Sequence, residues 1–103
     1  MFNLPTRLRV GPYFYDCSYI PMDDEGRSNM TEQCIRINDK FRGDRAAGIT
    51  LHELVHIWLD NYGIDLTEKQ NEDVCLAVEL GSVCFAKDEQ EFNIHMVEEM
   101  GKL

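Results

Sequence analysis

A chain of 103 residues, 44% of them hydrophobic, can bury one hydrophobic core and is too short for two domains. Its formal net charge of −9 would repel phosphate backbones, and its lysines and arginines form no separate cluster, so nucleic acid is not expected as a partner. No apolar run approaches the roughly 20 residues that span a bilayer, so no membrane partner is expected either.

Two β-strands are predicted near the beginning of the chain, at residues 7–10 and 13–20. Both segments are rich in β-forming residues. Gly11 and Pro12 separate them, and this dipeptide is typical of a turn. The sequence therefore predicts two adjacent strands.

A loop and a third strand should follow. Residues 21–30 have the acidic, glycine, serine and asparagine composition of a loop and show no periodicity. Residues 33–37 alternate, with Ile35 and Ile37 pointing to the same side. We therefore expect a small antiparallel sheet of about three strands, spanning residues 7–37.

Two or three helices are predicted after the sheet. Apolar residues cover most of the helical circumference at residues 44–62, which predicts a largely buried helix that ends before Gly63. Thr67 begins a capping box that starts a second helix at residues 67–85. The acidic segment 87–103 is predicted as a further helix or a tail. The expected fold class is α+β, with residues 1–103 forming a single domain.

The first helix contains the pattern H-E-x-x-H at His52, Glu53 and His56. Residues four apart lie on one face of a helix, about one turn apart, so both imidazoles can reach one zinc ion. Glu53 is offset by about 100° around the helix and lies beside the metal, where it can act as a general base for an activated water. The alternative is that both histidines are packed core residues, but burying them with a carboxylate and no metal would be costly.

A third metal ligand should come from the second helix. If the two helices form an antiparallel hairpin, the rise of 1.5 Å per residue places His56 about 9 Å and Glu72 about 8 Å from its tip. Glu72 is therefore the favoured ligand. Glu79 lies on nearly the same helical face and level with His52, so it is the alternative ligand.

Tyr62 stands at the end of the first helix and is the other candidate catalytic residue. Its hydroxyl could donate a hydrogen bond to a tetrahedral intermediate. A tyrosine at this place can equally be a packing residue at the helix end.

The order of short strands, an H-E-x-x-H helix and a following helix with a glutamate resembles the gluzincin zinc peptidases. It is most similar to minimal single-domain members related to the ImmA/IrrE and SprT-like folds, which are frequent in phages and prophages. Asn71 and Glu72 resemble the family's N-E-x-x-S-D segment, in which the glutamate binds zinc. The resemblance covers approximately residues 5–85 and implies a zincin-like domain.

This chain departs from the family pattern at Cys75 and Leu76, where the family has serine and aspartate. The carboxylate that usually stands behind a histidine ligand is therefore expected to be missing or to come from elsewhere in the chain. Residues 33–38 resemble the strand before the active-site helix. The resemblance implies that this strand edges the cleft and pairs with an extended peptide.

The expected function is that of a zinc-dependent metallopeptidase acting on a protein or peptide. The alternative is a zinc-stabilised binding or inhibitor protein of phage origin, which would use the same fold to occupy a host protein without catalysis. Met1 to Val10 lacks the apolar stretch of a signal peptide, and the four cysteines form no C-x-x-C pair. A cytoplasmic location with reduced cysteines is therefore expected.

Overall fold

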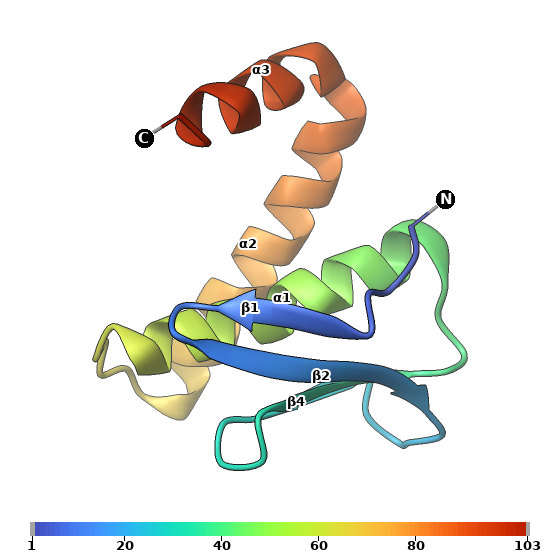
Figure 1. The fold of residues 1–103 in the computed structure, drawn as a ribbon, viewed down its shortest axis with the longest axis vertical. Helices are drawn as coiled ribbons and strands as arrows, with labels where there is room; N and C mark the ends of the chain where they lie inside the picture. Colours follow the sequence, from blue (N-terminus) through green and yellow to red (C-terminus); the bar gives the residue numbers. More distant parts are fainter. Residues whose placement is uncertain (1, 103) are drawn as a thin grey trace.

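The computed structural model describes residues 2–102 and has an α+β fold, as expected from the sequence (Figure 1). A four-stranded sheet is followed by three helices. The elements in chain order are β1 (Arg7–Val10), β2 (Tyr13–Ile20), β3 (Gly26–Asn29), β4 (Cys34–Asn38), α1 (Gly43–Asn61), α2 (Glu68–Asp88) and α3 (Gln90–Met100).

The sheet differs from the predicted one in two respects. The segment expected to be a loop contains β3, and the sheet is mixed because β2 and β4 pair in parallel in the strand order β1-β2-β4-β3. The strand β3 carries the sequence Gly-Arg-Ser-Asn, which has no hydrophobic alternation, so its strand character comes from antiparallel pairing with β4. As a consequence β4 is an inner strand and β3 forms the edge.

The hydrophobic core lies between the sheet and α1, which covers one face of it (Figure 1). Tyr15, Ile35 and Ile37 from the strands are at most 2% exposed, as are Ile49 and Ile57 from α1. The alternation predicted for residues 33–37 therefore does place both isoleucines in the core. Burying side chains of this size contributes about 1.5–3 kcal/mol each.

The ends of the helices follow the local signals in the sequence. Gly63 has a φ of +68°, in the left-handed region that glycine adopts without strain. Its amide donates to the carbonyl of Asp60 at 3.1 Å, and the amide of Ile64 donates to the carbonyl of Leu59 at 2.9 Å. These two bonds form a Schellman motif that ends α1. At Thr67 both hydrogen bonds of the predicted capping box are present.

The connection between Gly63 and Thr67 turns the chain so that α2 packs against α1. Figure 1 shows α2 continuing beyond this contact, with α3 at its far end. None of the helices in the described chain has the length and apolar character needed to cross a membrane.

Candidate metal centre

The site is an open cleft of about 660 Å³ bounded by β3, α1 and α2. The two histidines and the glutamate of H-E-x-x-H contribute to it from α1, and Glu72 and Glu79 contribute from α2. The structure therefore brings together all but one of the residues named from the sequence. Tyr62 is the exception: it follows α1, is 77% exposed and is not part of the cleft lining.

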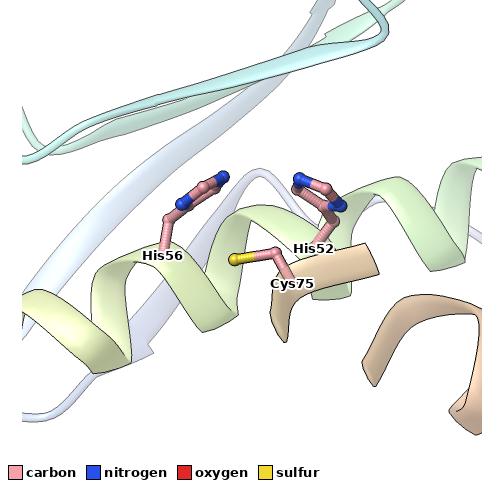
Figure 2. A group of neighbouring side chains, drawn as sticks. All are labelled: His52, His56 and Cys75. Carbon is pink, nitrogen blue, oxygen red and sulfur yellow. The ribbon is translucent and has the colours of Figure 1, made fainter. Parts of the chain in front are cut away.

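Both histidines project from the same side of α1, and their ring centroids are 5.0 Å apart (Figure 2). This follows from their spacing of four residues in the helix. Cys75 reaches the pair from α2. One ligand atom each from His52, His56 and Cys75 lie within 4.8 Å of one another, so this group could hold a metal ion.

Each imidazole uses its Nδ1 atom for a hydrogen bond to α2. Nδ1 of His52 lies 2.9 Å from Oε1 of Glu79, and Nδ1 of His56 bonds to Oδ1 of Asn71. Both partners are oxygen acceptors, so each Nδ1 carries the hydrogen and donates it. In the neutral form of each ring, Nε2 then presents a lone pair.

The Glu72 carboxylate lies against both Nε2 atoms. The distance between the carboxylate and Nε2 is 2.6 Å for His56 and 3.4 Å for His52. Lone pairs of two neutral imidazoles and of a carboxylate repel one another at these distances, so either a proton on Nε2 or a cation between the groups stabilises the arrangement. Two histidines and a glutamate form a common ligand set for catalytic zinc, so these residues fit the metal that the sequence suggests.

Cys75 is the other candidate for a third ligand. Its thiol is fully buried and donates a hydrogen bond to Oδ1 of Asn71 at 3.6 Å. It therefore shares an acceptor with Nδ1 of His56 and lies near that nitrogen, while Glu72 lies at Nε2. Burial, together with the charges of Glu72 and Glu53, raises the pKa of the Cys75 thiol to about 11, so the thiol is protonated when no metal is bound.

Glu79 stands behind His52 and is only 3% exposed. Its Oε1 accepts a hydrogen bond from Nδ1 of His52, and its Oε2 forms an ion pair with Nη1 of Arg45 at 2.6 Å. The second guanidinium nitrogen of Arg45 pairs with Glu25. This carboxylate therefore takes the place behind a histidine that the sequence leaves open at Leu76, and both of its oxygens are engaged.

A glycine allows Glu79 to approach α1. A Cβ atom at Gly48 would lie 3.2 Å from Cγ of Glu79 and 3.2 Å from Cγ2 of Val83. The spacing of Glu72 and Glu79, seven residues or about two turns, was the sequence signal for a shared face. Which residue of α1 bonds to Glu79 depends on the angle at which α1 and α2 cross. The spacing of residues within α2 carries no information on that angle.

Glu53 lies beside the histidines, where the sequence predicts it, and is 6% exposed. Burial raises the pKa of its carboxyl above the usual range, while a hydrogen bond from Ser28 and the nearby imidazoles of His56 and His52 lower it. Ser28 belongs to β3, a strand that the sequence pattern does not predict. Nothing in its local sequence indicates this contact, because it requires β3 to run alongside α1.

No protein-family model matches the chain, and comparisons with curated proteins and with solved structures likewise gave no match. We therefore infer the function from the geometry of the site.

Proposed function

We propose that the protein is a zinc-dependent metallopeptidase, with zinc held by His52, His56 and Glu72. The observation that carries this proposal is the convergence of two imidazole Nε2 atoms and a carboxylate on one point of an open cleft. Bound there, zinc would lower the pKa of a coordinated water to about 7 and polarise a carbonyl group.

Glu53 is the general base in this proposal. A base works best when its pKa lies near the operating pH, and burial shifts the carboxyl of Glu53 in that direction. Ser28 of β3 lies beside this carboxylate and lowers its pKa, which opposes the effect of burial. Glu53 is therefore placed to take a proton from an attacking water and deliver it to the leaving amine.

The substrate that fits the cleft is an extended peptide. β3 pairs on one side with β4, and Gly26, Arg27 and Ser28 of this strand line the cleft. A peptide can add to the edge of a sheet through main-chain hydrogen bonds. The edge available for this is β3, whereas the resemblance had implied the strand at residues 33–38, which the structure places inside the sheet.

The cleft favours peptides with basic side chains. Glu68 and Asp24 contribute negative charge to its lining, in a chain whose net charge is −9. Such a field raises the local concentration of cationic ligands. All four cysteines are free in the structure, which agrees with the reducing cytoplasm as the proposed location.

Two measurements test the proposal. Elemental analysis of the purified protein should find about one zinc per chain, and the variant with His52→Ala and His56→Ala should lose it. A peptide library digested by the zinc-loaded protein and read by mass spectrometry should show cleavage. Glu53→Gln should keep the zinc and slow cleavage about 10²–10⁴-fold.

The outcomes separate catalysis from binding. No zinc in the native protein would overturn the proposed metal site. Zinc without cleavage of any peptide would favour the alternative, a zinc-stabilised binding protein. Equal cleavage by the native protein and Glu53→Gln would show that Glu53 is not the base.

A further inference from the structure

The guanidinium of Arg45 joins three elements around the metal site. Arg45 belongs to α1, and its Nη1 atom lies 2.6 Å from Oε2 of Glu79 on α2. Its Nη2 atom pairs with Glu25, the residue that precedes β3. Both carboxylates line the cleft, whereas Arg45 does not. Arg45 therefore reaches the centre of the site only through other residues.

Arg45 and His52 lie on the same face of α1, because seven residues make about two helical turns. Gly48 lies between them, and a Cβ atom there would be 3.2 Å from Cγ of Glu79. Without a side chain at Gly48, the carboxylate of Glu79 reaches both neighbours. Its Oε1 accepts a hydrogen bond from Nδ1 of His52 at 2.9 Å, and its Oε2 meets Arg45. One face of α1 thus holds this carboxylate at both oxygens.

Glu79 needs both contacts to keep its position. It is only 3% exposed, so water would replace a lost partner poorly. A carboxylate held at one oxygen can still turn about that contact, whereas one held at both oxygens cannot. Of the lysines and arginines in residues 2–102, Arg45 alone forms an ion pair with Glu79. Loss of Arg45 would therefore leave His52 with a less firmly held acceptor.

We propose that Arg45 is a positioning residue of the metal site and acts on His52 through Glu79. This inference rests on the proposed zinc site. Arginine suits the role because the two nitrogens of its planar guanidinium meet two carboxylates at once. The contact with Glu25 holds one side of the guanidinium, so the other side is aimed at Glu79. Glu79 in turn orients the imidazole whose Nε2 atom faces the metal.

Arg45 has two effects on zinc binding, and they are opposite in sign. By aligning Glu79 and His52 it strengthens binding. Its positive charge repels a bound cation and weakens binding. A double-mutant cycle with Glu79 separates the two effects, because the alignment requires Glu79 and the repulsion does not.

The experiment measures zinc affinity by competition titration with a chromophoric chelator. Arg45→Met in the native background should weaken zinc binding about 10-fold, the lower end of the usual effect of losing an outer hydrogen bond. In the Glu79→Gln background the alignment is already lost, so Arg45→Met should leave the affinity unchanged or raise it. If Arg45→Met does not fold, Arg45→Lys gives the same comparison, because it keeps the charge and loses the two-sided contact.

Arg42→Met is the matched control. The guanidinium of Arg42 lies 3.7 Å from the centroid of the Tyr19 ring and donates to backbone carbonyls, so its removal should not weaken zinc binding. An equal loss from Arg45→Met in both backgrounds would overturn the inference, since Arg45 would then act independently of Glu79. A gain in both backgrounds would also overturn it, because only the repulsion would remain. Either result leaves the proposed zinc site intact, whereas a native protein without zinc would overturn both.

Discussion

Two imidazole nitrogens and a carboxylate meet at the centre of the site, while the other nitrogen of each ring is already engaged. Glu79 and Asn71 accept from the Nδ1 atoms of the two histidines and thereby fix the tautomer of each ring. Glu72 is the residue that faces both free Nε2 atoms. The geometry thus distinguishes residues that would touch a metal from residues that orient its ligands.

The first prediction separates Glu72 from Cys75 as the third ligand. Glu72→Ala should weaken zinc binding by more than about 100-fold, beyond the usual effect of losing an outer hydrogen bond. Cys75→Ala should retain zinc with similar affinity, because the thiol bonds to Asn71 and not to the Nε2 side. Competition titration with a chromophoric chelator measures both affinities. Loss of zinc only in Cys75→Ala would assign the site to the histidines and the cysteine.

The second prediction concerns Glu79. Glu79→Gln should lower zinc affinity about 10–100-fold, because the amide no longer fixes the His52 ring with a charge-assisted hydrogen bond. Glu25→Gln is the matched control, since Glu25 pairs with Arg45 but does not touch His52. It should leave the affinity nearly unchanged. Equal losses in both variants would mean that the charge near Arg45 matters and the bond to His52 does not.

The sequence predicts part of this site and not the rest. His52, Glu53 and His56 belong to one helix, so helix geometry alone predicts their arrangement. Glu72 requires only the additional assumption of an antiparallel hairpin. The contact of Glu79 with His52 depends on how α1 and α2 cross. The contact of Glu53 with Ser28 depends on β3, a strand that its own sequence does not predict. Contacts between elements are therefore the part that local patterns do not specify.

At the scale of elements, the packing of β3 against α1 forms the wall of the cleft. A Cβ atom at Gly26 would lie 2.6 Å from Cγ2 of Ile49 and 3.4 Å from Oε2 of Glu53. A side chain fits there only if the strand or the side chain of Ile49 moves. Glycine at this position therefore lets β3 pass close to the helix at the place where the proposed general base lies.

The third prediction tests this close approach. Gly26→Ala should destabilise the protein by about 1–3 kcal/mol, the usual cost of overpacking a tight contact. Gly81→Ala is the control: nothing lies within 4 Å of the added Cβ, and alanine in a helix should stabilise by about 0.5–1 kcal/mol. Urea unfolding followed by circular dichroism measures both changes. Equal stability of the native protein and Gly26→Ala would contradict the packing of β3 on α1.

Element prediction from the sequence succeeds where burial gives a period. The strand at residues 34–38 and the helix α1 both contribute to the core, and their apolar patterns predict them. The strand β3 is only partly buried and polar, so its sequence resembles a loop. Its pairing partner determines its structure, and a single segment cannot reveal a partner.

At the scale of the whole molecule, the proposed zinc ligands join two helices and leave the third untouched. His52 and His56 lie on α1 and Glu72 lies near the start of α2, whereas α3 contacts only α2. A metal bound by the folded state alone stabilises it by about 4.1 kcal/mol at a free concentration 1,000 times its Kd. Removal of zinc should therefore loosen one part of the molecule more than another.

The last prediction locates this effect. Adding zinc to the chelated protein should raise the protection of amides from hydrogen exchange in α1 and in the first half of α2, with little change in α3. Exchange followed by mass spectrometry measures each region, and the variant with His52→Ala and His56→Ala should show no response to zinc. A uniform response of all three helices to zinc would mean that zinc stabilises the whole fold, contrary to the location of its proposed ligands on α1 and α2 alone.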